Sequence, residues 1–231
     1  CVPSGQAAVL TADTANVCGG NFSYLEDNTG TTQHGNTAGV SYLGATGASA
    51  VANDGSGYFL SGSTINMPIR SATNTPVLET MIAISPTATG TQYYAGFVNT
   101  SPIGTTFEVA PTIGCYWAAT STENNWMAVS ANTTFRITNS NVASTTVTGT
   151  PRKLRVEMTD TSCKFYIQES STAVYRLIAE HTTSIPQNTD LYAGVYNGWT
   201  TAASAAQTTA RYFRFTFIRV WYRVQEAFMP F

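Results

Sequence analysis

Residues 153–167 read KLRVEMTDTSCKFYI, and this stretch decides the fold class. From residue 154 to 158, apolar and charged side chains alternate, which is the period-two pattern of a half-buried strand. The polar tetrapeptide TDTS then interrupts the pattern, and Asp160 suits a turn that bonds its own backbone. The alternation resumes at Cys163. The stretch therefore predicts an antiparallel hairpin.

Similar strand patterns recur along the chain, at a spacing of roughly ten residues, between clusters of Gly, Pro, Asn and Thr. They predict strands at 77–84, 93–98, 114–119, 126–130, 135–138, 175–181, 191–197 and 211–224. Segments with a helical apolar stripe are hard to find. The sequence therefore predicts an all-β protein, an antiparallel two-sheet jelly-roll sandwich.

The last of these strands contains a change of parity. From Phe213 to Phe217 the aromatic residues share one parity, and from Ile218 to Val224 the apolar residues share the other. This predicts a bulge near residues 217–218, or a strand that is covered on both faces.

The chain divides into three predicted parts. Residues 1–20 are expected to form an N-terminal arm or linker, residues 21–224 the β-sandwich domain, and residues 225–231 a C-terminal tail. The first fifty residues of the domain are rich in Thr, Gly, Ala and Asn and predict loop-rich edge structure. Arm and tail are both partly apolar, so we expect contacts with neighbouring subunits to order them. Because the chain starts at Cys1, a processed or truncated product is expected.

Composition restricts the classes of partner. Of the 231 residues, 43% are hydrophobic and only 10% are charged, and the net charge is -2. This balance argues against a phosphate-binding surface, so we expect no nucleic acid. Four arginines of the last strand, Arg211, Arg214, Arg219 and Arg223, alternate with bulky apolar residues and predict an edge or subunit contact. No apolar stretch approaches the length of about 18 residues that a membrane helix needs, so we expect no membrane.

Four cysteines allow three pairings. Cys115 and Cys163 lie in predicted strands, so a bridge between strands is one option, and Cys1 with Cys18 would close a short loop. Four buried thiols are the alternative. There is no Cys-x-x-Cys spacing, and neither histidine lies near a cysteine pair, so no zinc site is expected.

The hairpin is followed by HTTSIP at 181–186, LYAGVYN at 191–197 and FRFTFIRVW at 213–221. This order of strand cores resembles the concanavalin A-like lectin/glucanase jelly rolls of tailed-bacteriophage virion proteins, and GCYWAATSTENNWMAVS at 114–130 is similar to their middle strands. Phe217 and Ile218 stand where an acidic residue and a tyrosine commonly precede the terminal Arg-Val, so any role of that acid is absent here.

The resemblance implies a non-enzymatic virion structural protein on the particle surface: a head decoration, an appendage or a tail-fibre domain. Its expected partners are other copies of itself and neighbouring virion proteins. The first alternative is a glycan-binding host-recognition module, with a host-surface glycan as partner. The second alternative is a secreted glycoside hydrolase.

Hydrolysis on such a fold needs two carboxylates about 5 to 10 Å apart. The E-x-D-x-E spacing of the glucanases does not occur, Glu157 has outward parity, and Asp160 is a turn residue. Glu79 and Glu108 are acids that folding could still bring together. We therefore expect no catalytic residues. His181 ends a predicted strand, which indicates a capping or packing role.

One segment, NDGSG at 53–57, is a candidate calcium site because it offers carboxylate and amide oxygens. The simpler interpretation of this segment is a tight turn. We expect neither a metal nor a cofactor.

Two groups of aromatic and amide residues are candidates for glycan binding, because rings stack on sugar C–H surfaces and amides bond hydroxyls. The first contains Tyr116, Trp117, Asn124, Asn125 and Trp126, and the second contains Tyr196, Asn197 and Trp199. The alternative for both tryptophans of the first group is a place in the core. Trp199 follows Asn197-Gly198 and precedes a polar segment, so it is the better candidate for exposure.

Overall fold

The structure is a computed structural model of the chain. It describes residues 23–27, 33–37, 40–45, 55–61, 69, 75–84, 91–99, 111, 113–120, 123–144, 151–170, 173–187, 189–199 and 211–223. In the four strands before residue 62, except at residue 57, the structure describes the backbone but not the side chains. The same holds for residues 91, 120, 123, 124, 197–199, 211–216, 222 and 223. The predicted arm and tail lie outside these residues.

The described strands form two seven-stranded sheets in which hydrogen-bonded neighbours run antiparallel. Sheet I has the order β1 (Ser23–Asp27), β4 (Gly55–Ser61), β13 (Tyr192–Trp199), β6 (Thr91–Val98), β7 (Ile113–Thr120), β8 (Glu123–Asn132) and β9 (Thr134–Ala143). Sheet II has the order β12 (Arg176–His181), β11 (Cys163–Gln168), β10 (Arg152–Met158), β5 (Thr75–Ile84), β14 (Arg211–Arg223), β3 (Val40–Ala45) and β2 (Gln33–Thr37).

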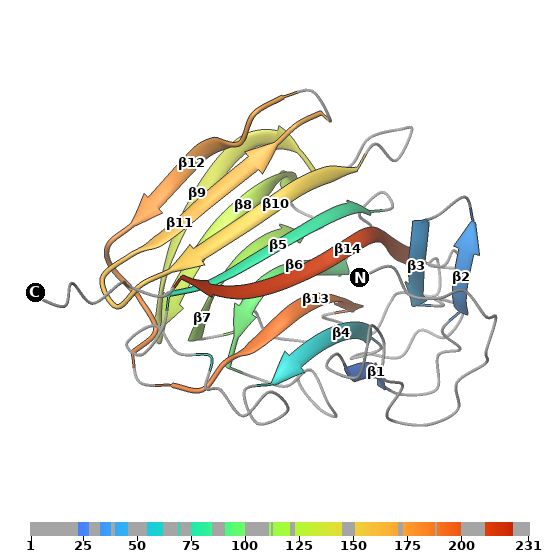
Figure 1. The fold of residues 1–231 in the computed structure, drawn as a ribbon, viewed down its shortest axis with the longest axis horizontal. Helices are drawn as coiled ribbons and strands as arrows, with labels where there is room; N and C mark the ends of the chain where they lie inside the picture. Colours follow the sequence, from blue (N-terminus) through green and yellow to red (C-terminus); the bar gives the residue numbers. More distant parts are fainter. Residues whose placement is uncertain are drawn as a thin grey trace, which may run out of the picture.

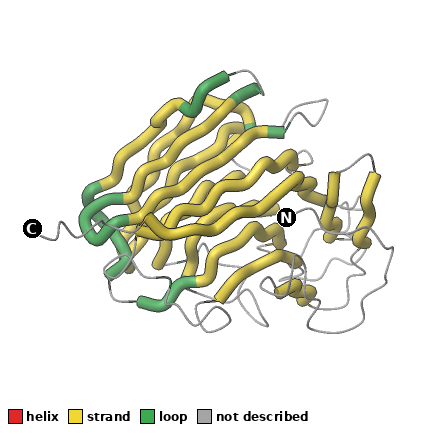
Figure 2. Tube along the Cα trace, in the orientation of Figure 1, coloured by secondary structure: helices red, strands yellow, loops and turns green. Residues whose placement is uncertain are grey.

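The two sheets stack as the layers of a sandwich (Figure 1). Between the layers the chain passes repeatedly from one sheet to the other, for example from β5 to β6 and from β9 to β10. The predicted all-β jelly-roll sandwich is therefore confirmed. Figure 2 shows the described residues as strands and loops. No helix of that part of the chain is long and apolar enough to cross a membrane.

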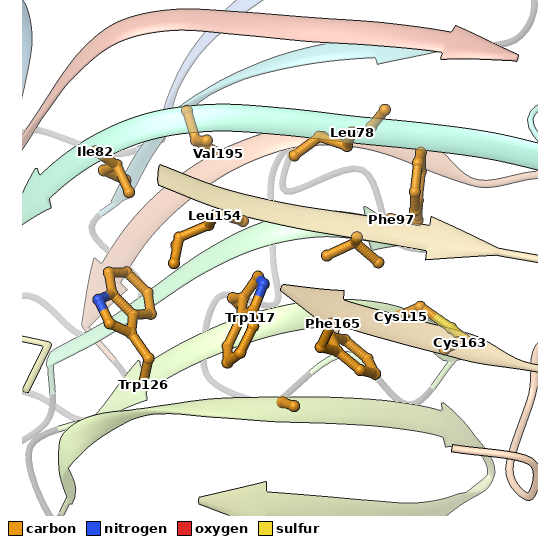
Figure 3. Close-up of a cluster of buried hydrophobic side chains, with 14 of the residues drawn as sticks. Leu78, Ile82, Phe97, Cys115, Trp117, Trp126, Leu154, Cys163, Phe165 and Val195 are labelled. Atoms are coloured by element: carbon orange, nitrogen blue, oxygen red, sulfur yellow. A yellow bond between two sulfur atoms is a disulfide. The ribbon is translucent and has the colours of Figure 1, made fainter. Parts of the chain in front are cut away.

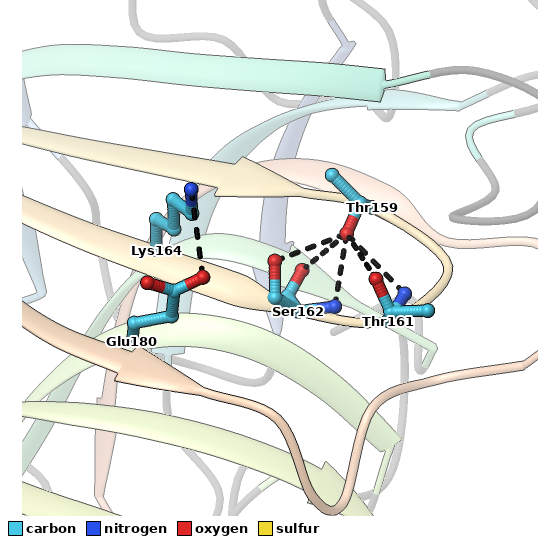
Figure 4. Close-up of polar contacts among 5 residues, drawn as sticks. All are labelled: Thr159, Thr161, Ser162, Lys164 and Glu180. Atoms are coloured by element: carbon cyan, nitrogen blue, oxygen red, sulfur yellow. Dashed lines mark hydrogen bonds and ion pairs between the residues drawn. The ribbon is translucent and has the colours of Figure 1, made fainter.

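The hairpin of β10 and β11 has the predicted register, with Met158 opposite Cys163 and Leu154 opposite Ile167. Its turn differs from the expectation. The Thr159 hydroxyl, rather than the Asp160 side chain, accepts hydrogen bonds from the backbone N–H groups of Thr161 (3.2 Å) and Ser162 (2.9 Å), as Figure 4 shows. Hydroxyls organise tight turns in the same way as short carboxylates.

The core lies between the sheets, and the apolar parity of each strand fills it (Figure 3). Trp117 and Trp126 of sheet I are fully buried there, so the core interpretation of both tryptophans is confirmed. The Trp117 ring packs edge-on against Phe165 of sheet II, at 5.5 Å between ring centres. Its indole N–H donates to the carbonyl of Arg155 at 3.2 Å, which ties the two layers together.

A disulfide joins Cys115 of β7 to Cys163 of β11, and so connects the two sheets across the core. The bridge between strands, one of the options that the sequence left open, is therefore confirmed. Cys1 and Cys18 lie outside the described residues.

Two sequence expectations about edges are wrong in detail. The described part of the region before residue 62 forms four strands, and β1 and β2 are each the outermost strand of a sheet. The apolar alternation in these strands is weak, so the sequence pattern did not predict them. The arginine-rich strand β14 is interior, because it pairs with both β5 and β3. Its register shifts between Phe215 and Phe217, which confirms the predicted bulge at a position slightly earlier in the chain.

Candidate functional site: the tyrosine face of sheet I

The outer face of sheet I, which points away from sheet II, carries a second apolar cluster. We call it the tyrosine face. It consists of Tyr94, Tyr116, Tyr192 and Tyr196 with Val98, Ala118, Met127 and Val129. These residues come from β13, β6, β7 and β8, which are four adjacent strands, and they occupy the parity opposite to the core residues. Tyr94, Tyr116 and Tyr196 are almost fully buried, although no described strand packs on this face.

The three buried tyrosines form one continuous group. Tyr196 of β13 is directly opposite Tyr94 of β6 in the strand register. The rings of Tyr94 and Tyr116 meet edge to face, at 5.4 Å between their centres. Such aromatic pairs add stability beyond the area that they bury.

Glycines beside the rings allow them to lie against the sheet. A Cβ atom on Gly57 of β4 would lie 2.5 Å from the Cδ1 atom of Tyr196. Gly96 has a φ of 154°, and its Cβ would lie 2.5 Å from the Tyr116 Cα. The absence of a side chain at these two positions therefore supports the ring positions.

The hydroxyls of this group are not equally bonded. Tyr116 donates to the Pro111 carbonyl at 3.0 Å. The buried hydroxyls of Tyr94 and Tyr196 have no hydrogen-bond partner among the described residues, and neither has the buried Oε1 atom of Gln92. Gln92 is two residues before Tyr94 on β6 and therefore shares its face.

Burial keeps these phenols protonated. It raises the pKa of Tyr94 and of Tyr196 well above the usual value, with smaller contributions from the neighbouring Tyr116 and Tyr192. Burial also raises the pKa of Tyr116. Near neutral pH each phenol can both donate and accept a hydrogen bond. The face therefore offers neutral polar atoms within an aromatic surface.

The first predicted glycan-binding group does not assemble. Trp126 points into the core, because Trp126, Ala128 and Ser130 alternate onto the inner face of β8, so it cannot stack on a sugar. This corrects its assignment as a ligand residue. Asn125 is half-buried and donates to Oδ1 of Asn139 on the edge strand β9, at 3.1 Å.

The structure describes only one side chain of the second predicted group, that of Tyr196. Tyr196 lies on the tyrosine face, and Tyr116 of the first group lies there with it. Asn197 and Trp199 belong to the end of β13, and their side chains lie outside what the structure describes. Asn125 of β8 and Tyr196 of β13 come from strands that β6 and β7 separate in sheet I.

Sequence reasoning missed Gln92, Tyr94 and Tyr192. Alternation in TQYYAGFV places Gln92 and Tyr94 on one parity and the core residues Tyr93 and Phe97 on the other. That signal was present, but the partner strand that brings Tyr196 to Tyr94 is far away in the sequence.

Three acidic residues of the described part of the chain, Glu157, Glu169 and Glu180, form ion pairs on sheet II. Glu157, which is buried, lies 2.6 Å from the Arg155 guanidinium. That guanidinium lies 5.4 to 5.8 Å from the ring centres of three aromatic residues, Tyr166, Tyr175 and Trp221. Asp160 is exposed in its turn, and Glu108 lies outside the described residues.

His181 does have a hydroxyl within hydrogen-bond reach. Its Nδ1 is 2.9 Å from Ser130 Oγ and its Nε2 is 2.9 Å from Thr138 Oγ1. Ser130 donates its only proton to the Thr183 carbonyl, at 3.1 Å. Nδ1 therefore carries the ring proton and donates to Ser130, and Thr138 donates to Nε2.

The same histidine is a packing residue rather than a catalytic base. Ser130 and His181 are 0% and 1% exposed, and they lie between the two sheets with both ring nitrogens of the histidine hydrogen-bonded. Burial, with a smaller contribution from Arg136, lowers the pKa of His181 to about 4. We call His181, Ser130, Thr138 and Thr183 the histidine cluster. It links β8 and β9 of sheet I to the end of β12 in sheet II.

The candidate calcium segment is not a turn throughout. Residues 55–57 are part of strand β4, which pairs with β1 and β13, and Gly57 makes room for the Tyr196 ring. Asn53 and Asp54 lie outside the described residues. Within the described part of the chain, no three His, Cys, Asp or Glu side chains gather closely enough to hold a metal ion.

No model of a known protein family matches the chain, and no curated protein matches it either. Solved structures do match. The Emp47p carbohydrate recognition domain is 12% identical, with 94% of each chain covered and a TM-score of 0.59. The exoplasmic/lumenal domain of VIP36, in its Ca²⁺/Man3GlcNAc-bound form, is 7% identical over 92% of this chain and 87% of that one, with a TM-score of 0.57.

Alginate lyase A1-II′, a member of polysaccharide lyase family 7, is 11% identical over 82% of each chain, with a TM-score of 0.51. At these identities the likeness shows the fold. It confirms the sandwich part of the sequence resemblance, while the virion context stays a prediction. The expectation that the chain is not an enzyme is wrong, because enzymes of this lyase family are built on the same fold.

Proposed function

We propose that the protein is a glycan-binding module and that the tyrosine face binds the glycan. The observation that carries this proposal is the pair of buried phenol oxygens, on Tyr94 and Tyr196, that lack a partner among the described residues. An unpaired buried hydroxyl costs stability, and a ligand hydroxyl would satisfy it.

The composition of the face fits a sugar. Tyrosine rings provide apolar surface for the C–H side of a pyranose, and the phenols provide hydrogen bonds for its hydroxyls. The matches to a carbohydrate recognition domain and to a Man3GlcNAc-bound structure support the same ligand class on this fold.

We propose that a ligand approaches the tyrosine face from the residues at its edge, which are more exposed than its centre. Gln92, Met127 and Tyr192 are half-buried, and Ile137 of the neighbouring edge strand is exposed. The Tyr94 and Tyr196 oxygens are buried in this structure, so a ligand reaches them only after a local rearrangement. Association is then slower than for a preformed open site.

Binding to a glycan array, followed by calorimetry with the best ligand, tests the proposal. We expect the wild-type chain to bind at least one glycan. The double variant Tyr94→Phe with Tyr196→Phe keeps both rings and removes both oxygens, and we expect its affinity to fall at least tenfold, because each lost hydrogen bond costs about 1 kcal/mol.

Tyr175→Phe is the matched control. It also removes one phenol oxygen, but from a residue whose ring lies beside Arg155 of sheet II. We expect this variant to bind as the wild type does. Absence of binding to every glycan on the array, or equal binding by the double variant, contradicts the proposal.

We also propose where such a module acts. The resemblance to virion proteins supports a host-surface glycan as the ligand and the virion surface as the location. The disulfide across the core supports a place outside a reducing cytosol. Pull-down of the wild type, but not of the double variant, by host-cell envelopes would agree with this placement.

A further inference from the structure

We propose that Gln92, Tyr94 and Tyr196 form one hydrogen-bonding subsite that takes the hydroxyls of a neutral sugar and discriminates against uronic acids and other acidic glycans. The inference rests on the proposed function, and it adds the chemical class of the ligand.

The three side chains lie together on the sheet. Gln92 and Tyr94 are neighbours on the same face of β6, and Tyr196 is opposite Tyr94 on β13. Opposite Gln92 on β13 is Gly198, which has no side chain to fill the space beside the amide. All three contribute a buried oxygen without a partner in the described part of the chain.

The donor and acceptor pattern of this group matches hydroxyls. The Gln92 Oε1 atom only accepts hydrogen bonds, and each protonated phenol accepts and also donates one. The group therefore needs a ligand that brings O–H donors as well as acceptors. Sugar hydroxyls have both capacities.

A carboxylate does not match this pattern. An ionised carboxylate only accepts, so it leaves the Gln92 oxygen unpaired, and it brings a negative charge into a buried surface. Among the described side chains of the outer face of sheet I there is no Lys or Arg to pair with it. The nearby residues are tyrosine, valine, alanine and methionine.

The test is a glycan array of matched pairs, in which each uronic acid-containing glycan is printed in its native form and in its carboxyl-reduced form. We expect the carboxyl-reduced form of a bound pair to bind at least tenfold more tightly than the native form. We also expect this binding to change little between low and high salt, because no ion pair carries it.

Two variants of Gln92, a half-buried residue, sharpen the test. Gln92→Met removes the acceptor and keeps the shape, and we expect weaker binding of the neutral forms. Gln92→Lys supplies a cation, and we expect the preference to shift at least tenfold toward the acidic forms. Gln187→Met, in an exposed loop of the sandwich, is the matched control and should leave the profile unchanged.

The outcomes separate the two proposals. Tighter binding of the native acidic forms by the wild type overturns the inference about ligand class and leaves the glycan-binding proposal in place. Equal binding of both forms also overturns it. Absence of binding to all forms overturns the proposed function itself.

Discussion

Two buried polar clusters in the described part of the chain, the histidine cluster and the tyrosine face, differ in how their hydrogen bonds are satisfied. In the histidine cluster, both ring nitrogens of His181 and the hydroxyl of Ser130 have partners at 2.9 to 3.1 Å. On the tyrosine face, the hydroxyls of Tyr94 and Tyr196 have none among the described residues. A satisfied network adds to stability, whereas unpaired buried groups reduce it, and our proposal is that those of the tyrosine face pair with a ligand.

The two clusters also differ in position. The histidine cluster lies between the sheets and connects them, whereas the tyrosine face belongs to sheet I alone. A change that weakens the contact between the sheets should therefore affect the histidine cluster first. A change in ligand binding should depend on the tyrosine face.

The largest effect is expected from removal of the Cys115–Cys163 disulfide, which joins the sheets. The bridge spans 48 residues of sequence, and loop-closure entropy gives it a contribution of about 4 kcal/mol to the free energy of unfolding. We expect the double variant Cys115→Ala with Cys163→Ala to lose about that much in chemical denaturation.

Glycan affinity, measured on the folded double-cysteine variant, should change little, because the ligand face does not involve the contact between the sheets. The wild type with and without a reducing agent is the control for the two substitutions. A strong loss of affinity together with a small loss of stability would contradict the division between the two clusters.

The next effect is a pH dependence that comes from His181. Its folded pKa of about 4 is below the unfolded value of 6.5. Above pH 6.5 the ring is neutral in both states and its contribution is complete. Below that pH the unfolded chain binds a proton that the folded chain does not, so stability falls by about 1.4 kcal/mol per pH unit down to pH 4, about 3 kcal/mol in total.

Denaturation curves between pH 8 and pH 4 measure this slope. Other groups titrate in the same range, so the relevant quantity is the difference between the wild type and His181→Asn, which lacks the titrating ring. We expect the variant to show a shallower slope. Parallel curves for the two proteins would mean that His181 is not held neutral by its surroundings.

The histidine cluster and the tyrosine face were not equally predictable from the sequence. The parity of residues 154–158 and 163–167 was sufficient to predict the core hairpin, because one strand face and one turn determine it. The role of His181 at a strand end was predicted as packing, and the structure agrees. Its partner Ser130 could have been found from the alternation of β8, in which Trp126 and Ala128 share its face.

The tyrosine face depends on the order of the strands in sheet I, and the apolar alternation along a single strand does not predict that order. Tyr94 and Tyr196 are about a hundred residues apart in sequence and meet because β13 inserts between β4 and β6. Trp126 was a candidate ligand residue for a different reason: an aromatic residue beside two asparagines fits a sugar site as well as it fits a core. The sandwich shows on which side of the strand the ring lies.

The smallest effects come from matched deletions of one oxygen in each cluster. Ser130→Ala removes a hydroxyl that bonds both His181 and Thr183, and we expect a loss of about 1 to 3 kcal/mol in the free energy of unfolding. Tyr94→Phe removes a hydroxyl without a described partner, so we expect no loss, or a gain of up to about 1 kcal/mol. If Tyr94→Phe costs as much as Ser130→Ala, its hydroxyl is bonded in the free protein, and the case for a ligand there fails. If it costs nothing while glycan affinity falls, the unpaired oxygen is kept for binding at the expense of stability, which is the pattern of a functional surface.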